Sequence, residues 1–495
     1  MSATPTAVDT PRSGCSYAAY DRTAAPSSRW GAWWRRPVGA AALVGIVVAA
    51  WGMVAIPARA TNGTLTTADE PQYLLTALSV FEDRDLNIDD ELAAARFAPF
   101  HELDLPVQTE VLDDGRQVSP HDPLLPAILA VPMGLGGWAA AKATLAILAG
   151  ALAALLTWTA HRRFAVPLGV AAGTVLAFGV TAPLSAYATQ VYPELPAAVA
   201  VTVAIAALTG RRHGTLLVFG VAVVALPWLG VKYAPVAAAL VAVAVGMLVR
   251  ERRARAAVTL AASLAVAGAA YLVAHRLLYG GWTVYAAGDH FTGGELTVMG
   301  GDPDYAGRSQ RLAGLLLDRG FGLAAWMPGY LLAVPALAAF VRRRPAGWWA
   351  LVVPLAAGWA TATWAALTMH GWWWPGRQVV VVVPCLVLAV AWWAGRLRVV
   401  RAAVAAAAAF GALAWGWLVV EVLARRSTLV VDFETTTNPA YRAWRALLPD
   451  YRNPDTGDWL VQAVWLVVLG ALAAGALVGP LAVRPRRRPR PAVRS

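Results

Sequence analysis

The chain has 495 residues, of which 58% are hydrophobic and 14% are charged. A soluble domain is about 45–50% apolar and about 25% charged, so this composition excludes an ordinary soluble globular protein. The apolar residues form runs of about 20, the length at which a helix crosses a bilayer, and they predict an all-α integral membrane protein. The net charge of +12 lies in short arginine clusters between these runs, which argues against a nucleic-acid partner.

The N-terminal segment precedes the first apolar run. Residues 1–36 are rich in Ser, Thr, Ala and Pro and are predicted to be a disordered cytoplasmic tail. The first run covers 38–57, directly after Arg35-Arg36. The sequence Ala58-Arg59-Ala60 at its end would also suit a signal peptidase, so cleavage of this segment stays open.

The loops between the apolar runs alternate between two kinds. Short basic connections alternate with loops that lack basic clusters, and the second kind includes 58–137, 279–321, 369–377 and 422–459. The positive-inside rule places the basic connections in the cytoplasm. It thus predicts about 12 spans within a membrane domain 37–483, outer long loops, and a basic cytoplasmic tail 484–495. The runs after the first are 138–159, 165–187, 193–209, 215–231, 233–249, 256–277, 322–341, 347–368, 378–395, 400–421 and 460–482. Pro227, Gly230 and Pro235 interrupt the pattern and leave the span count around 215–249 open.

The first outer loop begins with a predicted helix that starts at Asp69-Glu70. Asp is a favoured N-cap and Pro is tolerated in the first turn. An apolar stripe follows, formed by Leu74, Leu75, Leu78 and Phe81, so a short helix on the membrane surface is expected. Asp69 would then be a simple helix cap, with Glu70 complementing the helix dipole, or a functional carboxylate at the lipid–water boundary.

The same loop ends with His121-Asp122 in the segment Ser119–Pro126. The apolar stretch that follows ends near Leu135 and is too short to span, which predicts a second interfacial or re-entrant segment. The two polar residues either cap this second surface helix or face a site at the interface.

Two further outer connections carry charged residues. Tyr192-Pro193-Glu194 places an acid at the outer edge of the membrane, and Arg377 follows a tryptophan-rich segment that includes Trp373. The tryptophans alone are typical of an aromatic belt. Arg377 stands at an outward helix end, where it either snorkels to the interface or binds an anion such as a phosphate.

Other polar residues give weaker signals. Asp302 and Asp304 could bind a divalent cation, but two acids in a Gly-rich loop are more typical of a solvated loop. Lys232 lies near the outer end of a predicted span, where it would serve transport or meet a phosphate. The sequence has no P-loop, zinc-ligand spacing or nucleophile elbow.

In their order, these motifs resemble the polyprenyl-phosphate-dependent glycosyltransferases of the GT-C fold, over residues 38–395. The likeness is to the branch that contains protein O-mannosyltransferases and bacterial lipid A aminoarabinose transferases. It implies an inverting sugar transfer from a polyprenyl phosphate to the hydroxyl of a lipid, glycan or protein acceptor. The transfer would take place on the extracytoplasmic side of the bacterial inner (plasma) membrane.

The resemblance also implies roles for individual residues. Asp69 would be the general base, with Glu70 beside it, and desolvation is expected to raise the pKa of Asp69. The donor phosphate would be bound by Arg377, His121 and Lys232. The other substrate contacts would be Tyr73, Asp122, Tyr192, Glu194 and Trp373. Some relatives carry basic residues where this chain has Gln72 and the His121-Asp122 pair, so the sequence departs from the family pattern at these positions. No metal or other cofactor is expected to be obligatory, although a divalent cation is possible.

Two alternatives stand beside this hypothesis. A secondary transporter or lipid flippase would place functional polar residues at mid-membrane on broken helices, and Lys232 is the feature that favours it. A scaffold without catalysis would give Asp69-Glu70 no chemical task.

Overall fold

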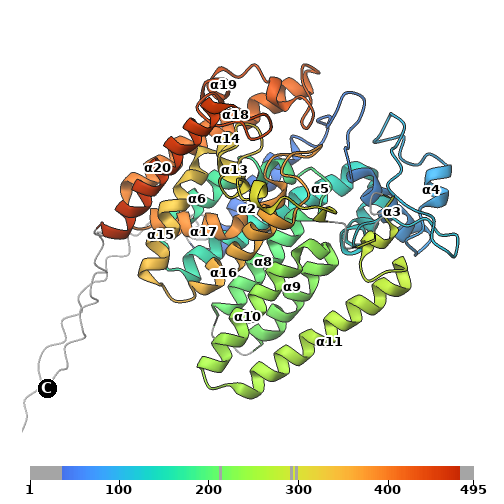
Figure 1. Ribbon diagram of the computed structural model, residues 1–495, viewed down its shortest axis with the longest axis horizontal. Helices are drawn as coiled ribbons and strands as arrows, with labels where there is room; N and C mark the ends of the chain where they lie inside the picture. The colour runs from blue at the N-terminus through green and yellow to red at the C-terminus, as the bar shows by residue number, and fades with distance from the viewer. Residues whose placement is uncertain (1–35, 211–213, 290–293, 296–298, 480–495) are drawn as a thin grey trace, which may run out of the picture.

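The computed structural model describes residues 36–210, 214–289, 294–295 and 299–479. The predicted tails 1–36 and 484–495 lie outside these residues except for Arg36. In the described part of the chain the regular structure is helical, and the loops are joined by isolated β-bridges only. The predicted all-α architecture is thereby confirmed (Figure 1).

Each predicted span coincides with helical structure. Six helices in the described ranges are long and apolar enough to cross a membrane, which supports an integral membrane protein. The other apolar helices are shorter or broken, so the number of spans and their sidedness remain predictions. The main helices after the first outer loop are α6 (Leu168–Gly179), α8 (Glu194–Leu208), α9 (Thr215–Leu229), α10 (Ala234–Arg250), α11 (Ala254–Tyr279), α15 (Ala333–Arg343), α16 (Trp349–Ala360), α17 (Val383–Ala394), α18 (Arg398–Leu423) and α20 (Thr456–Val478).

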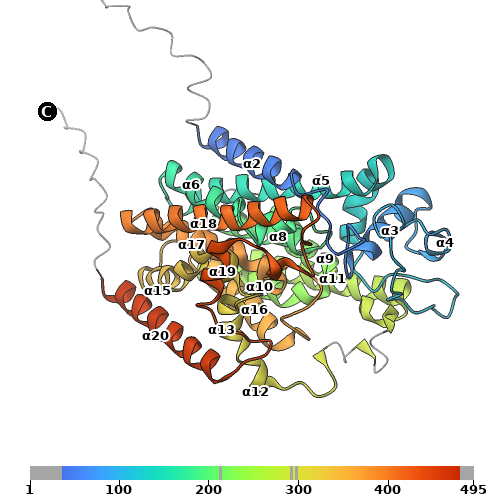
Figure 2. The same ribbon diagram turned by 90° about the horizontal axis from the view of Figure 1, so that it is seen from above.

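The centre of the helical body is formed by α17 and the 3₁₀-helix η7 (Arg377–Val382) that precedes it. Their residues are apolar on nearly all sides and are buried almost throughout, as expected of a helix enclosed by others. In contrast, α20 packs at the periphery and leaves most of its apolar side chains exposed. Figures 1 and 2 both show α20 along one side of the body, and α3 (Glu70–Glu82) and α4 (Asp89–Ala93) together at the opposite end.

Two glycines allow the first helix, α2 (Pro37–Met53), to lie directly against α5 (Leu124–Arg163). A Cβ atom on Gly45 would lie 2.6 Å from the carbonyl oxygen of Gly150, and one on Gly150 would lie 2.4 Å from that of Gly45. The two backbones therefore approach as closely as small residues permit, which is the usual way that helices associate in lipid.

A break at Gly137 divides α5 into two helical parts, 124–136 and 138–163. Gly137 has a φ of 63°, a conformation that residues with a Cβ rarely adopt. The sequence predicts this division, because the apolar stretch after His121-Asp122 ends near Leu135 and the next span begins at residue 138. The chain therefore changes direction at Gly137, between the short first part and the long second part of α5.

The helix α3 differs from the expected surface helix with a single apolar stripe. Residues 70–79 are all buried, and only the C-terminal end, with Phe81 at 37% exposure, is open. The reason is tertiary: α3 packs against α5, and the rest of the first loop encloses its polar side. The stripe formed by Leu74, Leu75 and Leu78 is buried within protein.

We expect Gly150→Ala to destabilise the fold by about 1–3 kcal/mol, because the added methyl group would overlap the Gly45 carbonyl. Gly173→Ala in α6 is the matched control, since a Cβ there meets nothing within 4 Å. Thermal unfolding in detergent, followed by tryptophan fluorescence, measures both variants. Equal midpoints for the two would contradict the close α2–α5 contact.

Candidate active site

A cavity of about 970 Å³ lies where the first loop meets the helical body. Its lining comes from the first loop, the connection between α9 and α10, the segment after α11, the end of α16 and the start of η7. Seven residues predicted from the sequence line this cavity: Asp69, Tyr73, His121, Asp122, Lys232, Trp373 and Arg377. The structure thus brings together residues that are more than 300 positions apart. Glu70, Tyr192 and Glu194 do not line the cavity.

Arg377 forms the centre of the charged end of the cavity. It is only 8% exposed; its Nη2 donates to Asp69 Oδ2 at 2.5 Å and its Nε to Glu194 Oε1 at 3.0 Å. Its guanidinium carbon lies 4.1 Å from the ring centroid of Tyr192 and 4.8 Å from that of Trp373. Ion pairs and aromatic rings together fix the guanidinium plane. Nη1 makes no hydrogen bond to the residues that the structure describes.

Glu194 holds both cations of the site. Its side chain is fully buried, and Oε1 accepts from Lys232 Nζ at 2.6 Å as well as from Arg377. The residue is the first of α8, directly after Pro193, so the turn Tyr192-Pro193-Glu194 sets its position. Lys232 is 30% exposed and lines the cavity. The predicted substrate contact Glu194 therefore lies behind the cavity wall and orients Arg377 and Lys232.

Asp69 is the N-cap residue of α3, but its side chain does not cap the helix. Its carboxylate turns instead to Arg377 and to His121, whose Nε2 lies 3.6 Å from Oδ2. Burial on its own would raise the pKa of Asp69, yet the charge of Arg377 and the contact with His121 outweigh it and hold that pKa well below its ordinary value. The expectation of a raised pKa is wrong for this state, because a cation lies directly against the carboxylate.

Two tyrosines surround this group. Tyr73 lines the cavity, one helical turn after Asp69, and its ring centroid lies 4.5 Å from that of His121. Tyr192 is fully buried; its hydroxyl donates to the Thr67 carbonyl and its ring lies against Arg377. Tyr73 can contact a ligand directly, whereas Tyr192 supports the arginine.

Glu70 faces the protein interior. It is fully buried; Oε1 accepts from the Thr67 amide at 3.2 Å and Oε2 from the Val191 amide at 2.8 Å. Burial raises the pKa of Glu70, opposed by the charge of Lys142. Oε2 thus ties the start of α3 to the segment before α8, while Oε1 holds the turn that precedes α3, and the geometry gives Glu70 a positioning role beside Asp69.

Asp122 anchors the other end of the first loop to α11. Its Oδ2 accepts from the Val231 amide at 2.9 Å, and its Oδ1 accepts from the Tyr271 hydroxyl at 2.8 Å and lies 3.0 Å from His275 Nε2. His275 and Tyr271 were not singled out from the sequence. The signal that could have found His275 is an ionisable side chain within a predicted span, which is rare unless it has a structural or functional partner.

The remaining wall of the cavity is mostly apolar, with Glu295 as a further charged residue. Leu229, Val236, Ala362 and Val381 contribute to it from α9, α10, the helix after α16 and η7. Tyr233, Trp282 and Tyr285 add aromatic rings that sequence reasoning missed, because nothing in their local pattern distinguishes them from interface aromatics. One cavity thus combines a charged end with a long apolar wall.

The two acids Asp302 and Asp304 of the loop 279–321 do not line the cavity. Asp304 caps a short helix by accepting from the Gly307 amide, and Asp302 is exposed, so these two acids behave as solvated loop residues. The described residues that line the cavity include no group of three His, Cys, Asp or Glu side chains arranged to bind a metal.

Comparisons with known proteins find one similar solved structure. No protein-family model matches the sequence, and no curated protein matches it. The crystal structure of ArnT from Cupriavidus metallidurans bound to undecaprenyl phosphate aligns with 88% of this chain and 77% of that chain, at 14% sequence identity and a TM-score of 0.47. A likeness at this level establishes neither a family nor an activity for this chain.

We expect Asp122→Ala to destabilise the protein by about 1–3 kcal/mol, because it leaves Tyr271, His275 and the Val231 amide without their buried acceptor. Asp113→Ala, at an exposed position of the same loop, should have little effect. Thermal unfolding of both variants in the same detergent checks this. If the midpoint of Asp122→Ala equals that of Asp113→Ala, Asp122 is not the anchor.

Proposed function

We propose that this chain is a membrane glycosyltransferase that moves a sugar from a polyprenyl-phosphate donor to an acceptor hydroxyl, on the extracytoplasmic side of the bacterial inner membrane. The observation that carries the proposal is the two-part cavity. Its charged end contains a carboxylate beside an arginine and a lysine, and its other wall is apolar. A lipid-linked phosphate sugar has the same division between anionic head and hydrocarbon tail.

The donor phosphate would bind Arg377 and Lys232. An arginine offers five donors in a planar fork that suits phosphate oxygens, and only Nε and Nη2 of Arg377 are engaged by described residues. Lys232 adds a partly exposed ammonium group at the cavity surface. His121 lies beside Asp69 and can add a third donor to the phosphate when protonated.

The chemical step requires one base. Asp69 takes the proton of the acceptor hydroxyl while the oxygen bonds to the anomeric carbon, and the bond from that carbon to the phosphate oxygen breaks. The electron pair leaves with the polyprenyl phosphate, which Arg377 and Lys232 stabilise. Attack from the face opposite the phosphate inverts the anomeric centre. A phosphate leaves without strong protonation, so a second carboxyl group is not needed.

Donor binding would also prepare the base. In the structure Arg377 holds the pKa of Asp69 low, so the carboxylate is a poor proton acceptor. When the phosphate becomes a partner of Arg377, the cationic charge is shared and the pKa of Asp69 rises. This order would keep the base weak until a donor is present.

A transporter or flippase would use the same cavity without breaking a bond. Lys232 favours that alternative from the sequence, but it lies at the cavity wall with its ammonium group paired to Glu194. Sugar transfer in detergent, where no membrane separates two compartments, distinguishes the two functions.

We expect Asp69→Asn to lower the rate of sugar transfer by about 10²–10⁴-fold, the usual contribution of a general base, with donor binding retained. The assay incubates purified protein with a panel of polyprenyl-phosphate sugars and candidate acceptors and measures released polyprenyl phosphate. Asp113→Asn is the control at an exposed acid of the same loop. Full activity of Asp69→Asn would contradict its role as the base.

We expect Arg377→Lys to weaken the binding of polyprenyl phosphate by about 10–100-fold, because a charge-assisted contact is worth about 1.5–3 kcal/mol. Binding of the lipid phosphate to detergent-solubilised protein is measured by thermophoresis. Arg116→Lys is the control, since Arg116 pairs with Asp114 in an exposed part of the first loop. Unchanged affinity in Arg377→Lys would place the phosphate elsewhere.

A further inference from the structure

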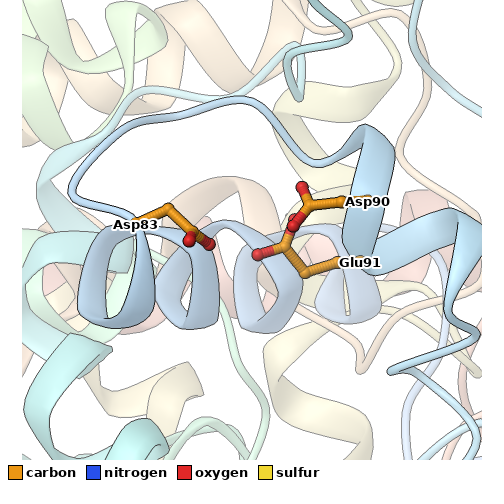
Figure 3. A group of neighbouring side chains, drawn as sticks. All are labelled: Asp83, Asp90 and Glu91. Carbon is orange, nitrogen blue, oxygen red and sulfur yellow. The ribbon is translucent and has the colours of Figure 1, made fainter.

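Three carboxyl groups converge at the end of α3 that is remote from Asp69. Asp83 is the C-cap residue of α3, and Asp90 and Glu91 belong to α4. One carboxylate oxygen from each residue lies within 4.8 Å of one oxygen from each of the other two. Figure 3 shows the three side chains reaching toward one another across the gap between the two helices.

Glu91 is the unusual member of this cluster. Its side chain is 98% buried, since its relative exposure is 2%, and neither carboxylate oxygen has a hydrogen-bond partner among the described residues. Burying a carboxylate without a partner is costly. Burial, together with the neighbouring Asp90 and Asp83 carboxylates, raises the pKa of Glu91 to about 8.

Among the described residues, no Lys or Arg side chain forms a salt bridge with these three carboxylates. Arg96, the nearest arginine along the chain after Glu91, is committed to Glu82, with its two terminal nitrogens 2.8 and 3.0 Å from the carboxylate oxygens. Asp85 is engaged as well, because its Oδ1 accepts from the Ser79 hydroxyl and from the Asn87 amide. Glu82 and Asp85 thus have partners of their own, whereas the buried Glu91 carboxylate converges with the exposed Asp83 and Asp90 without a hydrogen-bond partner among the described residues.

We propose that Asp83, Asp90 and Glu91 form a binding site for a hard divalent cation, and that this cation is Ca²⁺. Three carboxylates and no nitrogen or sulfur donor select a hard cation over zinc. Calcium accepts irregular oxygen geometry and completes its 6–8 ligands with water, which the exposed Asp83 and Asp90 leave room for. Magnesium requires near-ideal octahedral geometry and fits this set less well.

The bound cation would join the end of α3 to α4. The turn between these two helices contacts residues 117–118, which precede His121: the Ile88 amide donates to the Gln117 carbonyl and the Gln117 amide to Asn87 Oδ1. Residues 117–118 lead directly to Ser119 and His121. The site is about 20 Å from Asp69 along the 13 residues of α3, so it is distinct from the cavity.

The test uses full-length protein in lipid nanodiscs, freed of cations with a chelator and titrated with CaCl₂ by isothermal calorimetry. We expect one saturable site and a midpoint of thermal unfolding that rises with calcium concentration. Glu91→Gln should weaken calcium binding by at least about tenfold, because the ligand charge falls. It should remain folded without calcium, since a neutral amide replaces a buried unpartnered carboxyl of the same size.

Two further variants make the result specific. Asp83→Asn removes an exposed ligand without touching the core and should also weaken calcium binding, whereas Asp89→Asn, an exposed acid of the same helix outside the cluster, should bind as the parent protein does. No binding at millimolar calcium would overturn the proposal, as would equal calcium affinity in Glu91→Gln, Asp83→Asn and Asp89→Asn. A stronger response to ZnCl₂ or MgCl₂ than to CaCl₂ would overturn the assigned ligand.

Discussion

The buried contact of Arg377 with Asp69 and Glu194 is the interaction on which the arrangement of the site depends. A guanidinium removed from water must be paired, and removing one partner of such a pair is strongly destabilising. The three residues come from the start of η7, the first loop and the start of α8. Satisfying one buried charge therefore fixes the relative positions of three segments that are distant in the sequence, and the cavity forms where they meet.

The first loop is attached at both ends by buried carboxylates. Glu70 binds the Thr67 and Val191 amides near its beginning, and Asp122 binds groups of α11 and of the α9–α10 connection at its end. Asp69 and His121 each lie next to one of these anchors. In each pair of sequence neighbours, one side chain, Glu70 or Asp122, holds the chain in place, and the other, Asp69 or His121, lies at the cavity.

The sequence predicted the helices well because apolar runs and their breaks depend on local composition. Gly137, for example, divides α5 where the apolar pattern changes. It predicted most of the charged residues that line the cavity, but not their partners. That Glu194 lies behind Arg377, or that Arg377 lowers the pKa of Asp69, depends on contacts between residues 183 and 308 positions apart. Such contacts follow from tertiary packing and leave no local pattern, and the same holds for His275 against Asp122.

The two cations at the charged end of the cavity, Arg377 and Lys232, are both paired within the protein. Two carboxylates, Asp69 and Glu194, balance one guanidinium and one ammonium group. Under the proposed function, an anionic ligand would bind by exchange, replacing a carboxylate as the partner of Arg377 or Lys232. Under the same proposal, a ligand without a negative group would have nothing to exchange, so the cavity would discriminate between ligands by their charge.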